Sequence, residues 1–462
     1  MVLLGRKQEL KMLDKRYRSS KFEMVVIYGR RRVGKTALIN GFVKDKPVIF
    51  CTGIESSAAQ NLKSLSQEIM AYRKAPGDAV FSDFKSAIEA AFAIAEEERL
   101  VFVIDEYPYL AKAVPEFQSM LQNAIDIHKD SSRLFLILCG SSLSFMEQQV
   151  LEYQAPLYGR RTAQLKLKPL DFFAAKEFYP GFSPEDMAIA YGMVGGIPQY
   201  LRELDDSVSI EENIQNCFLD SSSFLFEEPM NLLKQETREQ ATYNSIIAAI
   251  AGGASRMSEI AVKAGLTSDA CSTYIKNLVS LGLVVKENPI ADKSSRRPVY
   301  KLTDNMFRFW YRFLPDNISL VMRGMAEIAC QRIMPYINEY MGFIFEDICR
   351  QYLWKLRRSE GNGLVFTDLG RWWGNDPRRK QQREIDIVGI GDGGSALFAE
   401  CKWRNEPANT AVLDDLIEDS GLVKCANKEF WLFSKSGFTE GCVSAANHMN
   451  NVVLRKYDDI IA

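Results

Sequence analysis

The sequence has few histidines and no paired cysteines. Among its 462 residues only two are histidine, His128 and His448, and neither lies in a partner motif. Histidine-centred catalysis is therefore not expected. The nine cysteines stand singly, with no C-x-x-C pair, so the sequence predicts neither a zinc knuckle nor a disulfide framework. We expect reduced, mostly buried thiols.

Long apolar runs and an excess of one charge are also missing. No N-terminal segment has the pattern of a secretion signal, and no uncharged run reaches about 18 residues, so we expect no membrane span and a cytoplasmic location. The net charge of −2 gives no chain-wide attraction to nucleic acid or anionic lipid. With 47% apolar and 25% charged residues, the composition is that of a globular protein.

What the sequence does contain is a phosphate-binding loop. Residues 29–36 read GRRRVGKT, which fits the pattern G-x-x-x-x-G-K-[ST]. An apolar run, 24–28, precedes the motif and a helical stretch, 37–43, follows it. This context favours a true phosphate-binding loop over the alternative of a simple Gly-rich turn. In such a loop, backbone N–H groups and the helix N-terminus attract phosphate.

The loop predicts ATP and Mg²⁺ as cofactors. Lys35 would reach the β- and γ-phosphates, and the Thr36 hydroxyl would bind Mg²⁺. The arginines in the variable part of the loop are expected to be mostly exposed. The remaining predicted nucleotide-binding residues of the loop are Gly29, Arg30, Arg31, Arg32, Val33 and Gly34.

A second motif favours hydrolysis over binding alone. The apolar run 100–104 is typical of a strand buried on both faces, and it ends in Asp105 and Glu106. In this Walker B arrangement Asp105 would hold Mg²⁺ and Glu106 would orient or activate the attacking water. A predicted strand at 47–51 lies between the two motifs in the chain, which fits a sheet with a strand inserted between the motif strands.

Small polar residues follow another predicted strand, 134–138. A side chain here would lie between the two Walker motifs and would touch the γ-phosphate or the attacking water. Ser141 or Ser142 is the candidate for this contact. A simple Gly-Ser turn is an equally good interpretation of either serine.

Two further segments resemble a known family. Residues 4–10 read LGRKQEL, similar to the GR-x-x-E-L opening of AAA+-related signal-transduction (STAND-type) and origin-recognition-like ATPases. The resemblance implies that Gly5 and Arg6 border the adenine pocket. Residues 195–201 read GGIPQYL, similar to the G-x-P motif of the helical lid, which implies a nucleotide contact for Pro198. A helix stop and turn would also explain this segment.

Together these motifs resemble the archaeal-type ATPase family, which also occurs in bacteria, over residues 1 to about 235. In related ATPases an arginine near Arg160 and Arg161 approaches the γ-phosphate. The resemblance therefore implies Arg160 as a nucleotide-binding candidate, either in the same chain or across a contact within a homo-oligomer. Two solvated or salt-bridged arginines are an alternative interpretation.

From Tyr243 the pattern is that of a winged helix. An amphipathic helix ends at Gly252-Gly253, Ser258 is the predicted cap of a short helix, and Thr267 is the predicted cap of a longer one. A hairpin formed by 281–286 and 298–302 follows.

Basic residues outnumber acidic ones in this region, which suits contacts with DNA phosphates. The longer helix has few side chains suited to reading base edges, so sequence-specific recognition is not expected. Packing as a protein module is the alternative. The basic residues are Lys263, Lys276, Lys286, Lys293, Arg296, Arg297 and Lys301.

The C-terminal region resembles restriction-endonuclease-like enzymes of the PD-(D/E)xK type. A predicted strand, 384–389, carries Asp386, and the paired strand, 396–403, carries Glu400 and Lys402. Period-two alternation places Glu400 and Lys402 on one face.

The chemistry of this pattern requires these residue types. Asp386 and Glu400 would hold Mg²⁺, which polarises a phosphate and acidifies a bound water. Lys402 would position that water or stabilise the developing charge. Glu346, at the start of a predicted helix from 342, matches the helical carboxylate of such enzymes. Charged residues on an ordinary hairpin are the alternative.

The sequence thus predicts a multidomain α/β protein: a P-loop NTPase parallel sheet with a helical lid, a winged helix-turn-helix and a restriction-endonuclease-like α/β domain. The predicted domains are residues 1–165, 166–235, 236–315 and 316–462. We expect an ATPase whose nucleotide state controls a Mg²⁺-dependent nuclease-like domain acting on nucleic acid, with DNA as the expected partner. The alternatives are a regulatory ATPase with a non-catalytic binding module and a winged-helix transcriptional regulator.

Overall fold

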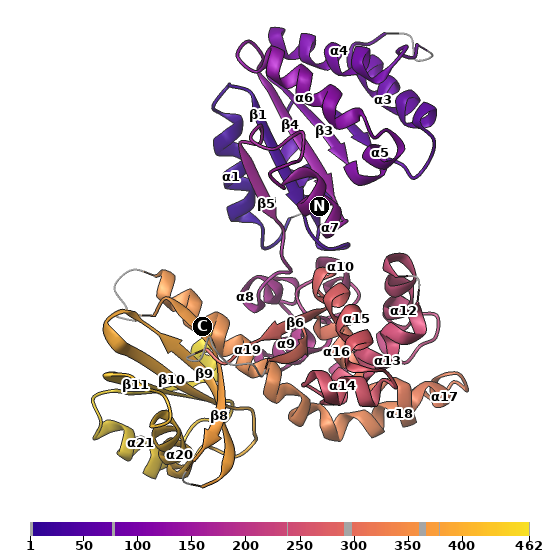
Figure 1. Cartoon of the computed structure of the whole chain (residues 1–462). Coiled ribbons are helices and arrows are strands. Elements are labelled where there is room, and N and C mark those ends of the chain that lie inside the picture. The colour runs from indigo at the N-terminus through magenta and orange to yellow at the C-terminus, as the bar shows by residue number, and fades with distance from the viewer. Residues whose placement is uncertain are drawn as a thin grey trace. The chain divides into compact units, whose positions relative to one another are not determined.

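The computed structural model describes residues 3–75, 79–237, 239–290, 298–359, 366–377 and 379–461. The chain divides into two compact units (Figure 1), residues 1–170 with 197–199, and residues 171–196 with 200–462. Among the helices in these described ranges, none is both long enough and apolar enough to cross a membrane.

The first unit is built on a five-stranded sheet in the order β2-β3-β4-β1-β5, in which all neighbouring strands are parallel. The phosphate-loop strand β1 and the Walker B strand β3 are separated by β4, so the predicted insertion of a strand between them is confirmed. The bounds are β1 Glu23–Tyr28, β2 Val48–Thr52, β3 Leu100–Asp105, β4 Leu134–Gly140 and β5 Ala163–Lys166.

Helices cover both faces of this sheet. Met24 and Val26 of β1 enter one core with α3 to α6, whereas Val25 and Ile27 enter a second core with α1 and α2. Successive strand residues point to opposite faces, so an uninterrupted apolar run is required. The bounds are α1 Lys7–Tyr17, α2 Lys35–Val43, α3 Ala58–Tyr72, α4 Phe84–Glu97, α5 Tyr107–Ala113, α6 Phe117–His128 and α7 Leu143–Phe145, followed by the π-helix Met146–Val150.

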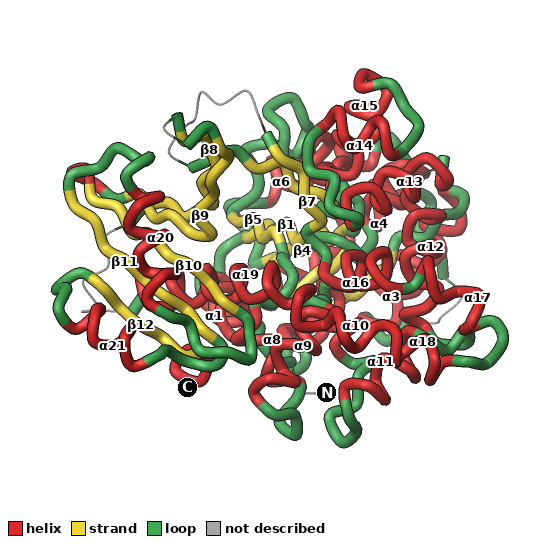
Figure 2. The backbone as a smooth tube through the Cα atoms, turned by 90° about the horizontal axis from the view of Figure 1, so that it is seen from below, coloured by secondary structure: helices red, strands yellow, loops and turns green. Residues whose placement is uncertain are grey.

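The second unit begins with a region of helices joined by loops, in which β7, labelled in Figure 2, belongs to a two-stranded hairpin. The short helix α10, Pro198–Leu201, contains the boundary between the units. The other bounds are α8 Phe172–Ala175, α9 Pro184–Val194, α11 Ile210–Phe218, α12 Phe224–Glu236, α16 Asn305–Phe313, α17 Ile318–Val321, α18 Ala326–Ile333 and α19 Ile337–Arg358.

Three helices and an antiparallel hairpin lie where the sequence predicts them. They are α13 Gln240–Ala251, α14 Met257–Lys263, α15 Ser268–Ser280, β6 Val284–Glu287 and β7 Val299–Leu302. The Thr267 side chain caps α15 by accepting from the N–H of Ala270 at 3.3 Å. The predicted cap Ser258 is wrong, because α14 begins before it and the Glu259 carboxylate accepts from the N–H of Arg256 at 3.1 Å. The predicted basic residues Lys293, Arg296 and Arg297 lie outside the described residues.

A second five-stranded sheet, in the order β12-β11-β10-β9-β8, forms the C-terminal part. Strands β8 to β10 pair antiparallel, whereas β10 to β12 pair parallel. Leu432 packs in a core with α20 and α21, and the adjacent Phe433 contacts Tyr352 of α19, so helices cover both faces. The bounds are β8 Asp368–Asp376, β9 Gln381–Ile390, β10 Ser395–Lys402, β11 Asn427–Ser434, β12 Val452–Lys456, α20 Thr410–Ser420, α21 Glu440–Asn447 and α22 Tyr457–Ile461.

The helix that carries Glu346 is longer than predicted. It begins at Ile337, so the predicted start at Gly342 is wrong. Buried residues at Ile337, Tyr340 and Ile344 continue the helical spacing through Gly342, and this packing outweighs the glycine.

Candidate functional site

The phosphate loop between β1 and α2 has a backbone that explains its two glycines. A Cβ atom at Gly29 would lie 2.4 Å from the carbonyl oxygen of Leu167, which leaves no room for a side chain. Gly34 has a φ of 92°, in the left-handed region that favours glycine. Helix α2 begins at the next residue, so its N–H groups open toward the loop.

Lys35 is held inside the loop. Its side chain is buried, and Nζ donates to the carbonyl oxygens of Gly29 at 3.0 Å and Arg30 at 2.9 Å. Burial lowers the pKa of Lys35, while the nearby acids Glu106 and Asp105 act in the opposite direction. The ammonium group therefore lies on the side of the loop that faces the Walker B acids.

The structure brings the two predicted Mg²⁺-binding residues of this unit together. The Thr36 hydroxyl donates to Asp105 Oδ2 at 2.7 Å, and Asp105 Oδ1 accepts from the N–H of Glu106 at 2.9 Å. A hydroxyl and a carboxylate oxygen at this separation can share one cation, since both are hard oxygen ligands.

Glu106 is fixed in an unusual conformation at the end of β3. Its φ of 47° is left-handed, which is uncommon outside glycine. The carboxylate oxygen Oε2 accepts from the hydroxyl of Ser141 at 2.9 Å. The structure therefore brings Ser141, the residue after the adjacent strand β4, to Glu106, whereas Ser142 precedes the short helix α7.

The prediction that the loop arginines are mostly exposed is wrong. Arg30, Arg31 and Arg32 are each only partly exposed. The guanidinium of Arg31 donates to the hydroxyl of Tyr109 at 2.9 Å, which ties the loop to α5. This contact pulls the side chain toward the protein.

The N-terminal segment braces the same loop. Arg6 is 4% exposed, and its Nη2 donates to the carbonyl oxygens of Val33 at 3.0 Å and Lys168 at 2.7 Å. Gly5, with a φ of 66°, makes the turn that precedes it. Pro198 also lies close to the loop, 3.6 Å from where a Cβ at Gly34 would stand. Arg6 and Pro198 thus both lie against residues 29–36, whereas the predicted adenine and nucleotide contacts stay predictions.

Arg160 lies elsewhere. It forms a two-pronged ion pair with Asp126, with contacts of 3.1 and 2.7 Å. It precedes β5, whose first residue Ala163 pairs with Val25 in the first half of β1. The phosphate loop follows the other end of β1, and this six-residue strand spans about 20 Å. Arg160 therefore does not approach the loop of its own chain. Within one chain, the alternative interpretation of Arg160 as a salt-bridged residue is correct.

The C-terminal residues of the PD-(D/E)xK pattern meet where β9 and β10 part. The last paired residues of the two strands are Ile387 and Ala399, so Asp386 and Glu400 are the next residue on each. Asp386 Oδ2 accepts from the N–H of Cys401 at 2.9 Å, and Lys402 Nζ lies 2.5 Å from Glu400 Oε1.

Burial perturbs the acids of this cluster. It raises the pKa of Glu400 to about 7 and that of Glu346 to about 8, and the charge of Asp386 adds to both shifts. Burial likewise raises the pKa of Asp386. Burial lowers the pKa of Lys402, but the charges of Glu400 and Asp386 outweigh this and raise it overall. Acids crowded in this way favour binding of a proton or a cation.

The cluster does not contain a three-residue metal site. The residues that the structure describes include no group of three or more His, Cys, Asp or Glu side chains placed to hold a metal ion. Asp386 and Glu400 supply two carboxylates, which suits Mg²⁺ when water or phosphate oxygens complete its shell. Glu346 instead lies 3.5 Å from Arg371 Nε.

Arg371 is a member of this cluster that sequence reasoning missed. It is 9% exposed and also contacts Glu384 at 3.3 Å. The segment 370–374 gives Arg371 no role by itself, since its partners come from α19 and β9, and only the pairing of β8 with β9 brings it there.

Residues before and after β6 contact the C-terminal sheet. The N–H of Ile290 donates to the carbonyl oxygen of Arg371 at 3.0 Å, and Arg256 donates to Gln382 at 2.9 Å. Lys301 forms an ion pair with Glu287 at 3.1 Å. These contacts favour the protein-packing interpretation for this side of the hairpin.

Two family models match the chain. An ATPase domain found predominantly in Archaea matches residues 3–204, and a family described as archaeal and bacterial proteins of unknown function matches residues 310–412. The first match contains both Walker motifs and Pro198.

Two curated relatives and one solved structure are also similar to the chain. The uncharacterised protein MJECL04 of Methanocaldococcus jannaschii is 32% identical over 409 residues, covering 87% of this chain and 88% of that protein. The uncharacterised ATP-binding protein MJ0423 of the same organism is 40% identical over 55 residues, covering 11% of this chain and 93% of that protein. The Walker-type ATPase PABY2304 of Pyrococcus abyssi has a similar fold, with a TM-score of 0.52 and 20% identity, over 67% of this chain and 96% of that one.

Proposed function

The chain belongs to the family of the M. jannaschii protein MJECL04, with a P-loop ATPase domain in its N-terminal part, and we propose that it hydrolyses ATP with Mg²⁺ at residues 29–36, 105 and 106. Lys35 would contact the β- and γ-phosphates, Thr36 and Asp105 would hold Mg²⁺, and Glu106 would act on the attacking water.

The arrangement of three adjacent strands carries this proposal. The loop after β1, the acids that end β3 and the serine after β4 meet at one edge of the sheet, and Thr36–Asp105 and Ser141–Glu106 contacts join them. Ser141 would keep Glu106 oriented between turnovers. The residues present fit Mg²⁺, since hydroxyl and carboxylate oxygens are its preferred ligands.

Two substitutions test it. Glu106→Gln is expected to retain ATP binding and to lose at least about a hundredfold in turnover, because the amide cannot activate water. Lys35→Ala is expected to lose binding. Glu97→Gln, a change of the same type at the end of α4, serves as the control. Turnover of Glu106→Gln equal to that of the control would remove Glu106 from the mechanism.

A second proposal concerns the C-terminal cluster. We infer that Asp386, Glu400 and Lys402 form a Mg²⁺-dependent site that cleaves nucleic acid, with DNA as the expected substrate. Its support is the meeting of these residues at the point where β9 and β10 part, together with the raised pKa values of the buried Asp386 and the partly exposed Glu400. A bound metal ion would polarise the phosphate of the substrate and lower the pKa of a bound water. Lys402 would hold that water, and Glu346 would act through Arg371.

Cleavage of labelled DNA with Mg²⁺ or Mn²⁺ tests this second proposal. Asp386→Ala and Glu400→Ala are expected to abolish cleavage, whereas Asp414→Ala on the exposed side of α20 is expected to leave it intact. No cleavage by the unmodified protein, with ATP turnover intact, would instead favour a regulatory ATPase with a binding module. A sequence-specific footprint retained in the variants would favour a regulator that binds DNA through the winged helix proposed for α13 to β7.

A further inference from the structure

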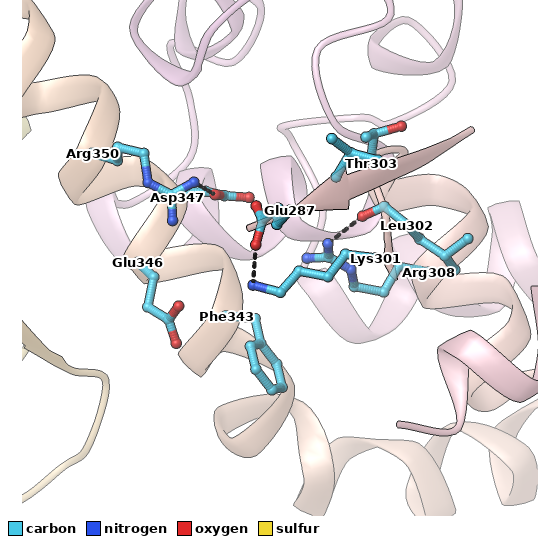
Figure 3. A pocket seen from close by; sticks show the side chains of 10 residues that line it. Glu287, Lys301, Leu302, Thr303, Arg308, Phe343, Glu346, Asp347 and Arg350 are labelled. Carbon is cyan, nitrogen blue, oxygen red and sulfur yellow. Dashed lines mark hydrogen bonds and ion pairs between the residues drawn. The ribbon is translucent and has the colours of Figure 1, made fainter. Parts of the chain in front are cut away.

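A cavity of about 210 Å³ lies within the second unit, between the β6–β7 hairpin and α19. Figure 3 shows Glu287 and Lys301 of the hairpin facing Asp347 and Arg350 of α19, with Arg308 of α16 beside them. The volume is below the range of about 300–1,000 Å³ typical of sites for drug-sized ligands. It therefore suits a small group better than a whole cofactor.

Most charges that line the cavity cancel in pairs. Lys301 Nζ lies 3.1 Å from Glu287 Oε2, and Arg350 Nη1 lies 3.2 Å from Asp347 Oδ1. The third lining acid, Glu346, is paired with Arg371 from β8.

Arg308 is the cation left over. Within the part of the chain that the structure describes, its guanidinium forms no ion pair, and Nη2 donates a hydrogen bond to the carbonyl oxygen of Leu302. The other terminal nitrogen, Nη1, is buried without a hydrogen-bond partner among the same residues. Arg308 as a whole is partly exposed, but a buried N–H donor without an acceptor is unfavourable, so an anion that accepts from Nη1 would relieve this cost.

We propose that this cavity binds a phosphate group, held by Arg308 with Arg350 and Lys301. Guanidinium and ammonium groups from two walls are the donors that recognise phosphate most strongly. The proposal does not depend on the proposed cleavage activity, because none of the three cations belongs to the Asp386–Glu400–Lys402 cluster. The phosphate could belong to a free ion, a mononucleotide or the 5′ end of a nucleic acid, which share this chemistry.

Calorimetric titration with inorganic phosphate, without added metal, tests the proposal. The protein is the full-length chain carrying Lys35→Ala, a substitution that weakens phosphate binding at residues 29–36. Saturable binding is expected, and Arg308→Gln should weaken it at least about tenfold. The matched control is Arg312→Gln, on the same helix one turn later, where the side chain lies 3.8 Å from Glu339 and outside the cavity. Arg350→Gln changes the opposite wall and is the second variant if Arg308→Gln does not fold.

Competition distinguishes the sources. Displacement of inorganic phosphate by a 5′-phosphorylated oligonucleotide, but not by its 5′-hydroxyl form, would support a nucleic-acid end. Displacement by AMP alone would support a nucleotide, and displacement by neither would support the free ion. The proposal is overturned if the Lys35→Ala protein shows no saturable binding, or if Arg350→Gln and folded Arg308→Gln bind phosphate as the control does.

Discussion

At the residue scale, the acids of the C-terminal cluster should make the stability of the protein depend on pH. The pKa values of Glu400, about 7, and Glu346, about 8, lie above the ordinary value of 4.5. Between about pH 4.5 and 8 the folded protein therefore holds protons that the unfolded chain has released. Without metal, the free energy of unfolding should fall as pH rises through this window.

Mg²⁺ should reverse this trend, because a cation replaces the protons. We predict that added Mg²⁺, without nucleotide, raises the melting temperature more at pH 8 than at pH 6. Glu400→Gln should remove most of the difference, whereas Asp414→Asn should not. An equal Mg²⁺ effect at both pH values would argue against a metal at Asp386 and Glu400.

The glycines of the chain give a second residue-scale prediction. Gly29→Ala places a methyl group 2.4 Å from Leu167 O, and such overpacking should lower the free energy of unfolding by about 1–3 kcal/mol. Gly342→Ala is the opposite case, since a Cβ there meets nothing within 4 Å in the interior of α19. It should stabilise by up to about 1 kcal/mol. Urea unfolding of both variants measures the contrast.

At the element scale, local signals predicted the strands and helices, and partners distant in sequence decided the rest. The strand-loop-helix context identified residues 29–36 because those signals are contiguous. For Arg160 the option of a nucleotide contact within the same chain was wrong, because its position depends on the direction of β5 beside β1, which the motif does not encode. Ser258 was predicted as a cap, whereas in the structure the side chain of Glu259 reaches back to two N–H groups. Arg371 was missed because its partners come from other elements.

Helix α19 joins the helical region to the C-terminal sheet. The buried hydroxyl of Tyr340 donates to the carbonyl oxygen of Gly192 in α9 at 2.7 Å, while Phe345 of the same helix packs on Trp403. Tyr340→Phe should cost about 0.5–1.5 kcal/mol, because it removes a buried hydrogen bond. Tyr336→Phe, at a residue that is 53% exposed, should cost nothing measurable. Chemical unfolding of the two variants compares them, and equal stabilities would contradict this role for Tyr340.

At the scale of the whole molecule, the chain combines a P-loop ATPase unit with a second unit that ends in an acid-and-lysine cluster. The fold of the second unit does not by itself determine its chemistry, since one fold can host many functions. We predict that the bound nucleotide controls the proposed cleavage activity of the C-terminal cluster. ATP would act as a switch by favouring one of two conformations of the protein.

Cleavage of linear, circular and single-stranded DNA with Mg²⁺, with and without ATP, tests this central claim most directly. The account predicts cleavage by the unmodified protein that changes with ATP, no cleavage by Lys402→Ala under any condition, and cleavage by Lys35→Ala that no longer responds to ATP. Cleavage by Lys402→Ala at the unmodified rate, or an ATP response retained in Lys35→Ala, would contradict it.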